Sequence, residues 1–304
     1  MTTTIHPSAP PNHLAPDELR VRPAADGISL AIDPARAGWR YLGFRALALG
    51  AAERLDLGGP GVETAVVVVA GGGVSLVSDG AQLHLEGRQT VFDGKPWAAY
   101  LPPDCRAQVT ATTAEDHHVV LAIAEAPASG RAAVATVPML IKPQDIAVEI
   151  RGAGNATRRI HHIITPEFPA DRLEVVEVYT PAGNWSSWPP HKHDVDDMPN
   201  EAVLEEIYYY QQRRAHEGWG VQRLYRRDGD RRDGLWTVRH GELVLVTDGY
   251  HPFVAAHGYD AYYLNALAGD RRTMACTDDP DLAWTRAAWA EMQPDPRAMA
   301  MVVG

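Results

Sequence analysis

The chain has 304 residues, of which 45% are hydrophobic and 22% charged, and these fractions exclude a mainly disordered, collagen-like or coiled-coil protein. It carries 28 Lys and Arg against 39 Asp and Glu, a formal net charge of −11, which argues against sequence-independent nucleic-acid binding. Its two cysteines, Cys105 and Cys276, are too few for a disulfide framework and fit a reducing compartment.

Residues 1–25 are rich in Pro, Thr and Ala without a hydrophobic period, and we expect them to form an arm. Beyond the arm, short β-branched or alternating runs bounded by Gly, Pro, Asp and Asn predict strands. In chain order these runs are Thr64–Ala70, Val74–Val77, Gln82–Leu85, Trp97–Leu101, Ala107–Ala111, Val119–Ala124, Leu173–Tyr179, Glu205–Gln211, Val221–Tyr225, Leu235–Val238, Leu243–Val246 and Ala261–Leu264. Turn residues separate them, including Ser78-Asp79-Gly80 and Asp228-Gly229-Asp230, so the pattern predicts an all-β sandwich or barrel.

The strand signals fall into two groups, about 35–127 and 146–275, separated by the proline-containing segment Ala126–Pro143. Two such groups predict two tandem barrels, which we place at residues 26–140 and 141–304. A short helix is expected near the C-terminus, with Asp279 as N-cap, Pro280 as first residue and Leu282–Met292 as body.

The sequence also limits the partners. The longest apolar run, Ala65–Ala70, is far too short to cross a bilayer, and the N-terminus lacks the basic and apolar regions of a secretory signal, so we expect a cytoplasmic protein without a membrane partner. Gly71–Gly73 lies between two strand-like runs and predicts a hairpin turn rather than a nucleotide-binding loop, so no nucleotide cofactor is expected. Exposed strand edges and the arm are compatible with a homo-oligomer.

The chemically informative stretch is GNWSSWPPHKHD, residues 183–194. His191 and His193 stand two residues apart, a spacing that puts both imidazoles on one face of a strand, where a shared metal ion can use them. A third ligand should come from a neighbouring strand. The run Glu205–Gln211 offers one, because a carboxylate that faces a barrel interior is costly unless it is ligated or paired. By strand alternation Glu206 shares a face with Tyr208, whereas Glu205 points the other way.

A fourth ligand could be His251, which follows the turn Asp248-Gly249. Three histidines and one glutamate suit one borderline divalent ion, namely Zn, Mn, Fe, Co or Ni, and leave positions open for water or substrate. The pairs His161-His162 and His117-His118 are consecutive, so each pair points to opposite faces of a strand, and we interpret both as structural.

This order of ligands resembles the cupin motifs, in which a Gly, then His-x-His and a Glu on the next strand are followed by a turn and another His. The thirteen residues from His193 to Glu206 are more than the common form has, and the first strand group has no His-x-His, so it would be a degenerate cupin barrel. More narrowly, the chain resembles the 5-deoxy-glucuronate isomerase family of bacterial myo-inositol catabolism, related to the hexuronate ketol-isomerases. The resemblance is carried by Ala170–Leu173, Glu177–Pro181, Asn184–Asp194, Leu204–Tyr210, Gly218–Arg223, Asp248–Pro252 and Gly258–Asn265, with weaker likeness at Gly43-Phe44, Gly87-Arg88 and Val91–Asp93.

The resemblance implies a metal-binding bicupin that isomerises an aldose to a ketose, 5-deoxy-D-glucuronate to 5-dehydro-2-deoxy-D-gluconate. It places the metal ligands at His191, His193, Glu206 and His251. Proton transfer through an enediolate and a hydride shift both remain open as routes. We expect Tyr208 to be a catalytic residue because it shares the face of Glu206. Arginine is the usual partner of a substrate carboxylate, and Arg223 and Arg158 lie in the region of about 145–290 where the resemblance is dense.

A cupin scaffold does not determine function, and two other classes remain open at this stage. A cupin dioxygenase would use Fe(II) and consume oxygen during turnover. A sugar-acid-binding cupin without enzymatic activity would bind its ligand equally well after the metal is removed.

Overall fold

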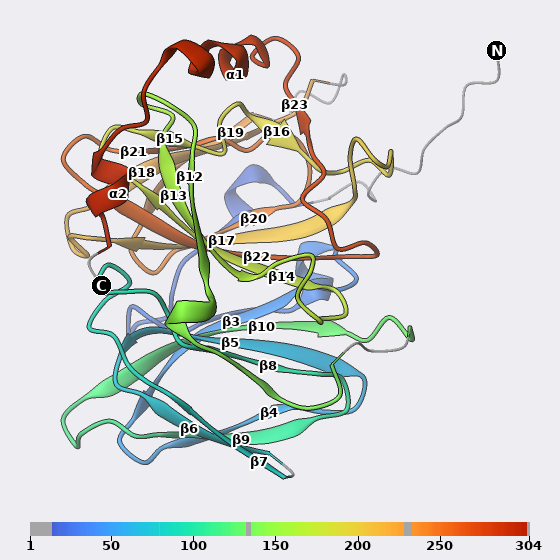
Figure 1. The fold of residues 1–304 in the computed structure, drawn as a ribbon, viewed down its shortest axis with the longest axis vertical. Helices are drawn as coiled ribbons and strands as arrows, with labels where there is room; N and C mark the ends of the chain where they lie inside the picture. Colours follow the sequence, from blue (N-terminus) through green and yellow to red (C-terminus); the bar gives the residue numbers. More distant parts are fainter. Residues whose placement is uncertain (1–13, 79, 132–134, 228–232, 303–304) are drawn as a thin grey trace.

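The computed structural model describes residues 14–78, 80–131, 135–227 and 233–302. Within these ranges strands dominate, and they form two barrels stacked along the long axis of the molecule, as Figure 1 shows. The expected all-β architecture of two tandem cupin barrels is therefore confirmed. Residues 1–13 of the expected arm and the turn residues Asp79 and Asp228-Gly229-Asp230 lie outside the described ranges.

The first barrel contains a six-stranded sheet of order β11-β8-β5-β10-β3-β2 and a four-stranded sheet of order β4-β9-β6-β7. Its strands are β2 (Leu30–Ile32), β3 (Gly43–Gly50), β4 (Arg54–Gly58), β5 (Val62–Gly71), β6 (Val74–Ser78), β7 (Ala81–Leu85), β8 (Ala98–Leu101), β9 (Arg106–Ala111), β10 (His118–Pro127) and β11 (Met139–Ile141). Short 3-10 helices lie between β2 and β3, η2 (Pro34–Ala37), and after β11, η3 (Pro143–Asp145).

The second barrel contains a seven-stranded sheet of order β1-β20-β17-β22-β14-β13-β12, a four-stranded sheet of order β15-β21-β18-β19, and the pair β16-β23. Its strands are β1 (Arg20–Val21), β12 (Ala147–Arg151), β13 (Arg158–Ile164), β14 (Leu173–Thr180), β15 (Trp185–Ser186), β16 (His191–Lys192), β17 (Leu204–Gln212), β18 (Trp219–Tyr225), β19 (Asp233–Arg239), β20 (Leu243–Val246), β21 (Phe253–Ala255), β22 (Ala261–Gly269) and β23 (Thr277–Asp278). Helical elements are η1 (Pro16–Glu18), α1 (Trp284–Ala288), η4 (Trp289–Glu291) and α2 (Arg297–Ala300).

The two barrels follow the same path. The order β8-β5-β10-β3-β2 corresponds strand by strand to β20-β17-β22-β14-β13, and β4-β9-β6-β7 corresponds to β15-β21-β18-β19. The duplication is therefore visible in the topology although the sequence has no strict repeat. One connection between strands differs greatly in length between the two barrels. Residues 187–203 connect β15 to β17 and contain β16, whereas the equivalent link from β4 to β5 is only Gly59–Gly61. The first barrel has no room there for a His-x-His segment.

Three elements differ from expectation. The C-terminal helix is shorter than Leu282–Met292, because α1 ends at Ala288 and continues only as the 3-10 turn η4. The carboxylate of Asp279 accepts a hydrogen bond from the backbone N–H of Asp281, so it caps the turn that leads into α1, whose own N-cap position is Ala283. It also accepts hydrogen bonds from Tyr225 and Arg227, which tie the segment to the end of β18. The seam also contains β11, which pairs with β8 of the first barrel, and the arm contains β1, which pairs with β20 of the second.

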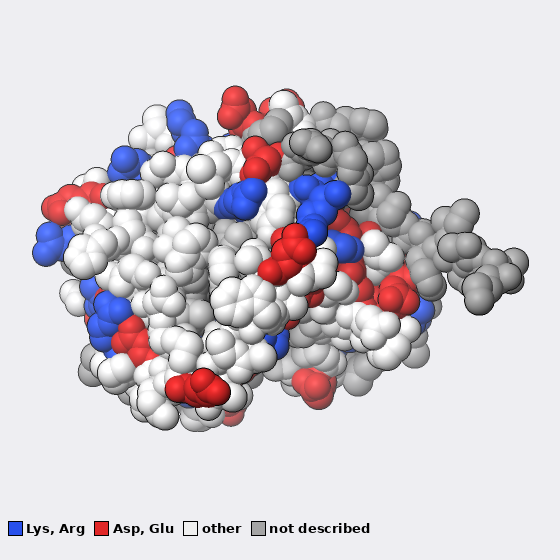
Figure 2. All heavy atoms as spheres, turned by 90° about the horizontal axis from the view of Figure 1, so that it is seen from above, with Lys and Arg blue, Asp and Glu red and all other residues white. Residues whose placement is uncertain are grey.

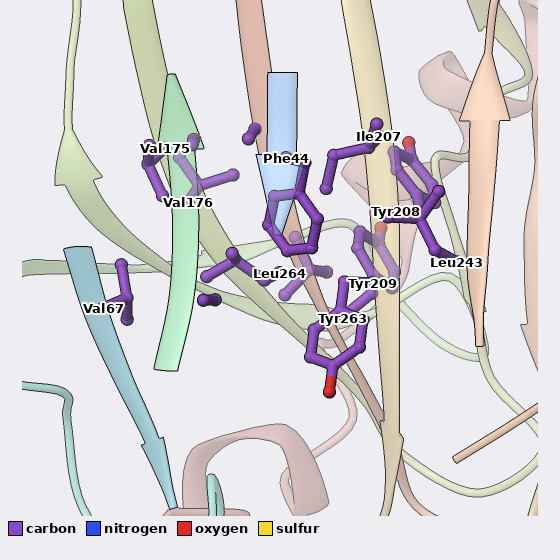
Figure 3. Close-up of a cluster of buried hydrophobic side chains, with 14 of the residues drawn as sticks. Phe44, Val67, Val175, Val176, Ile207, Tyr208, Tyr209, Leu243, Tyr263 and Leu264 are labelled. Carbon is purple, nitrogen blue, oxygen red and sulfur yellow. The ribbon is translucent and has the colours of Figure 1, made fainter. Parts of the chain in front are cut away.

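The large sheets of the two barrels pack face to face and share one hydrophobic core. Phe44 on β3 lies against Tyr209 on β17, with ring centroids 5.6 Å apart, and both rings are visible in the close-up of this core in Figure 3. Val67 of the first barrel and Leu264 of the second belong to the same cluster. Alternation along a strand explains the arrangement, because residues on one face of each large sheet point to the other barrel while the remainder point inward.

The interior of the first barrel is filled. Its inward-facing side chains form a separate apolar cluster that includes Val66, Val68, Leu76, Leu121 and Ile123, all fully buried. A core packed with aliphatic side chains offers no donor set for a metal or a sugar, so the chemistry must lie in the second barrel.

No helix in the described ranges is long and apolar enough to cross a membrane. On the face that carries α1, basic and acidic side chains are interspersed and no patch of one sign covers the surface, as Figure 2 shows. A small charged ligand is therefore not recognised by the charge of this face as a whole, and charge recognition must be sought in a pocket.

Candidate metal centre

Three side chains meet inside the second barrel. His193, Glu206 and His251 are buried, and their ligand atoms all lie within 4.8 Å of one another. Nε2 of His193 lies 2.7 Å from a carboxylate oxygen of Glu206, and Nε2 of His251 lies 3.3 Å from the same oxygen. Three of the four predicted ligands thus converge although 58 positions separate His193 from His251 in the chain.

The histidines are oriented by backbone carbonyls. Nδ1 of His193 lies 3.0 Å from the carbonyl oxygen of Leu204, and Nδ1 of His251 lies 3.0 Å from that of Gly249. Nδ1 of His191 lies 3.2 Å from the carbonyl oxygen of Pro189. A carbonyl can only accept, so each Nδ1 must carry the hydrogen. The Nε2 atoms of His191 and His251 therefore keep their lone pairs, whereas Nε2 of His193 faces the Glu206 carboxylate. This is the second-shell arrangement typical of metal-binding histidines.

His191 lies beside this cluster. Its ring centroid is 4.7 Å from that of His251, but its ligand atoms are not among those within 4.8 Å of one another. Nε2 of His251 is buried and has no hydrogen-bond partner among the described residues. A buried nitrogen lone pair without a donor is costly, and a divalent cation would satisfy it, so the donor set fits a metal ion.

The protonation states of the cluster follow from burial and from the charge of Glu206. Burial lowers the pKa of His191 and of His251 to about 3, so both imidazoles are neutral at pH 7. Burial also acts on His193, but the Glu206 carboxylate outweighs it and raises the pKa of His193. Burial would raise the pKa of Glu206, yet His193 and His251 bring it below its ordinary value, so Glu206 stays ionised and can serve as a ligand.

The two adjacent glutamates of β17 have different surroundings. Glu205 lies on the opposite face, where its carboxylate accepts backbone N–H hydrogen bonds from Arg40, Tyr41 and Leu42 of the first barrel. Glu206 faces inward, and one of its oxygens accepts a hydrogen bond from the side-chain amide of Asn265. The register of β17 is therefore the one that alternation predicted.

The residues between His193 and Glu206 form an ordered loop. Glu201 is buried and accepts hydrogen bonds from the backbone of Asp194 and Val195 and from the ammonium group of Lys192. The backbone N–H of Leu204 returns to the carbonyl oxygen of His193. These bonds close the loop and bring His193 next to Glu206 despite the long spacing.

The cluster opens into a cavity of about 280 Å³. Its walls come from β13, β14, β17 and β22, and its rim comes from the segment before β23 and from α1. The lining residues are Arg151, Arg158, Ile160, His162, Val176, Val178, Ser187, His191, His193, Leu204, Glu206, Tyr208, Tyr263, Asn265, Leu267, Met274, Ala275, Cys276 and Arg286. A cavity of this size and mixed polarity accommodates a small polar molecule.

Arg158 differs from the other two arginines of this cavity because it has no carboxylate partner among the described residues. Arg151 forms an ion pair with Glu149, and Arg286 forms one with Asp278. Arg158 is only 4% exposed, and its guanidinium group donates to the carbonyl oxygen of Ala156 without a carboxylate partner among the described residues. Burial lowers its pKa to about 10, so it is still charged at pH 7. A buried and unpaired guanidinium group that lines a cavity is suited to bind an anion.

Arg223 does not reach this cavity, contrary to our expectation. It forms an ion pair with Asp233 and lies in a different surface depression. The reason is the orientation of β18, which directs Gly220, Gln222 and Leu224 inward and Arg223 outward.

Tyr208 lines the cavity next to the cluster. Its ring stacks on that of Tyr263 at a centroid distance of 4.3 Å and an interplanar angle of 7°. Its hydroxyl oxygen lies 2.6 Å from Oγ of Ser187, and its ring centroid lies 5.9 Å from that of His251. Burial raises the pKa of Tyr208 well above 10, so the phenol is neutral and can act as a hydrogen-bond donor.

Several residues of this site were not predicted. Asn265, Tyr263 and Ser187 line the cavity, and Gln222 donates a hydrogen bond from its side-chain amide to the carbonyl oxygen of His251. Asn265 and Tyr263 carried a signal, because alternation along Ala261–Leu264 puts both on one face of a strand. Gln222 is a neutral residue within an apolar strand, and nothing in its local sequence marks it.

Comparison with known proteins places this site in a family. The family model described as KduI/IolB family matches residues 19–285. A protein of Geobacillus thermodenitrificans named 5-deoxy-glucuronate isomerase is 40% identical over 264 residues, which cover 86% of this chain and 92% of that protein. One of Geobacillus kaustophilus with the same name is 41% identical over 266 residues, with the same coverage of both chains.

Solved structures of other proteins also resemble this chain. An IolB-like protein from Salmonella typhimurium superposes with a TM-score of 0.80 at 36% identity, covering 88% of this chain and 98% of that one. An oxalate decarboxylase of Lactobacillus farciminis superposes with a TM-score of 0.62 at 8% identity, covering 96% and 98%, a likeness of fold alone. The fold, the buried cluster and these relatives lead to one conclusion: this chain is a member of the KduI/IolB family.

Proposed function

We propose that this protein is a 5-deoxy-glucuronate isomerase, an intramolecular oxidoreductase that converts 5-deoxy-D-glucuronate to 5-dehydro-2-deoxy-D-gluconate in myo-inositol degradation. The observation that carries the proposal is one cavity that is lined both by His193 and Glu206, which converge with the buried His251, and by the unpaired Arg158. The relatives named 5-deoxy-glucuronate isomerase, which match most of the chain, support the same substrate.

His193, Glu206 and His251, with His191 as a fourth ligand, would hold one divalent ion, which is Zn, Mn, Fe, Co or Ni. When bound, such an ion stabilises the negative charge that develops on the carbonyl oxygen and neighbouring hydroxyl oxygen during isomerisation. The protein supplies the geometry: the three Nδ1–H···O=C contacts fix the imidazole rings, and Asn265 fixes the Glu206 carboxylate.

The remaining groups of the cavity bind and orient the substrate. Arg158 pairs with the carboxylate of the sugar acid, which places the aldehyde end of an extended chain towards the histidines. Tyr208 donates a hydrogen bond to a substrate oxygen near the reacting carbons. Leu204, Leu267, Val176 and Val178 surround the site with apolar surface and limit water in the cavity.

The first experiment uses the purified protein and the substrate alone. We expect NMR to show loss of the aldehyde signal of 5-deoxy-D-glucuronate and appearance of the 2-deoxy-5-keto acid, without added NAD, ATP or oxygen. Chelation should abolish the conversion, and a divalent ion should restore it, because the cluster needs a cation to organise it. Oxygen uptake coupled to turnover would instead identify a dioxygenase, and metal-independent binding without conversion would identify a sugar-acid-binding protein.

We expect Arg158→Met to raise the KM for the sugar acid about 10- to 100-fold with a smaller change in kcat, because a charge-assisted contact to a carboxylate is lost in ground state and transition state alike. Arg223→Met is the matched control, since Arg223 lies outside the cavity and should leave both constants near their wild-type values. Steady-state kinetics with both variants decides the matter. An Arg158→Met variant with the wild-type KM would refute the assignment of the carboxylate site.

A further inference from the structure

Ser187 has an uncommon backbone conformation. Its φ is +49°, in the left-handed region, where a side chain with a Cβ atom is disfavoured and glycine is the usual residue. The residue lies between β15 and β16, two positions before the cavity's Pro189–His191 segment, and is 5% exposed. A strained residue in a buried wall of a binding cavity raises the question of what its side chain does there.

The hydroxyl group of Ser187 has a specific neighbour. Its Oγ atom lies 2.6 Å from the hydroxyl oxygen of Tyr208. Among the described residues, Ser187 is the one hydrogen-bond partner of the Tyr208 hydroxyl group. A weaker contact of 3.4 Å joins the same Oγ to the hydroxyl oxygen of Tyr263. Tyr263 in turn donates to Oγ of Ser186 at 3.1 Å. Of the two serines, only Ser187 contacts the Tyr208 hydroxyl among the described residues.

The ring of Tyr208 is already immobile. It stacks on Tyr263 and packs at nearly a right angle to His251, with an interplanar angle of 83°. With the ring fixed, the torsion of the C–O bond is the remaining freedom of the hydroxyl group. A hydrogen bond to the phenolic oxygen from one side leaves the phenolic hydrogen free to point to the other side.

We propose that Ser187 is a positioning residue for the isomerisation: its Oγ–H donates to the Tyr208 oxygen and so directs the Tyr208 O–H towards the substrate oxygen that becomes negatively charged. The left-handed backbone is the conformation that brings Oγ to this place. Glycine would fit the turn without strain but would lack the hydroxyl group. The inference rests on the proposed function, since it concerns an oxygen of the same sugar-acid substrate.

The test separates the backbone from the hydroxyl group. Ser187→Gly removes Oγ and relieves the strain, so the variant should fold at least as stably as the wild type while kcat falls about tenfold. The KM and the metal content should stay unchanged, because Ser187 contacts neither Arg158 nor a ligand. Ser187→Ala should lose the same tenfold in kcat. Ser186→Ala is the matched control and should keep kcat within about twofold.

Coupling to Tyr208 completes the test. Tyr208→Phe should lower kcat about 100-fold, as expected for loss of a donor to a developing oxyanion, and adding Ser187→Gly to Tyr208→Phe should lower it no further. If the wild type converts the substrate and Ser187→Gly has the same kcat, this inference is overturned and the proposed function is not. Additive losses in the double variant overturn it as well. A wild-type protein that binds the sugar acid without converting it overturns the proposed function and this inference with it.

Discussion

Glu206→Gln is expected to lose the divalent ion and about three orders of magnitude in turnover. Glu206 is the shared neighbour of His193 and His251, and the carboxamide removes the negative charge that attracts the cation to the buried site. Stabilisation of transition-state charge by a metal is worth several kcal/mol, and about 1.4 kcal/mol is a factor of ten in rate. Metal analysis of the purified variant and single-substrate kinetics are the two measurements.

The neighbouring glutamate supplies the control. Glu205→Gln makes the same chemical change one residue earlier, but Glu205 binds the backbone of Arg40, Tyr41 and Leu42 and not the cluster. It should keep a full complement of metal and lose about 1–3 kcal/mol of unfolding free energy, because three N–H groups lose a charged acceptor. The opposite pattern, metal loss only in Glu205→Gln, would mean that the register of β17 is shifted by one residue.

The second large effect concerns stability and lies between the barrels. Arg88, which follows β7 of the first barrel, pairs with Glu177 on β14 of the second, and both side chains are at most 4% exposed. The Glu177 carboxylate also accepts hydrogen bonds from the hydroxyl groups of Tyr179 and Tyr262 and lies 3.2 Å from Nδ1 of His161. Arg88→Met would leave this carboxylate buried without its cation.

We expect Arg88→Met to reduce the free energy of unfolding by about 3–5 kcal/mol at pH 7, as for other buried pairs that lose one partner. Urea unfolding followed by tryptophan fluorescence measures the effect. Arg214→Met, which breaks the exposed pair with Glu217, is the control and should change little. An Arg88→Met variant as stable as the control would show that the pair does not hold the barrels together.

The effect should depend on pH. Burial alone would raise the pKa of Glu177, but Arg88 and His161 outweigh it and lower the pKa to about 2, below the ordinary value of 4.5. A depressed carboxyl pKa contributes stability that is complete above about pH 4.5 and is lost as the pH falls towards 2. The difference between wild type and Arg88→Met should therefore shrink as the pH falls from about 4.5 towards 2.

Much of this site was predictable because its ligands follow local rules. Two-residue spacing put His191 and His193 on one face. Alternation put Glu205 and Glu206 on opposite faces, and the family resemblance indicated Glu206 as the ligand. Arg223 shows where alternation is insufficient: it defines two faces of β18, but only the packed structure shows that Gln222 points inward and Arg223 outward. Val221 shares the outward face with Arg223 although it is apolar, so hydrophobicity does not distinguish the two faces of this strand.

The remainder of the cavity depends on topology. Arg158, Cys276 and Arg286 come from β13, the segment before β23 and α1, and no local pattern relates such distant segments. The fold itself was easier to predict, because β-branched runs and turn residues recur along both halves. The very short strands β15, β16 and β23 left no such pattern, since two residues are too few to show alternation.

The two-sided burial of β5 has a consequence for any attempt to shorten the chain. Val66 and Val68 face the filled interior of the first barrel, whereas Val67 and Val69 face the second, so one run of valines supports two compartments. A fragment that begins at residue 141 would retain every proposed ligand, yet it would present to water the apolar side of its large sheet, which Phe44 and Val67 now cover. Exposed surface of that kind promotes aggregation. The first barrel thus keeps the second barrel folded and separate from other molecules by covering its apolar face. We therefore expect the whole duplicated chain to be the smallest stable unit that retains the site.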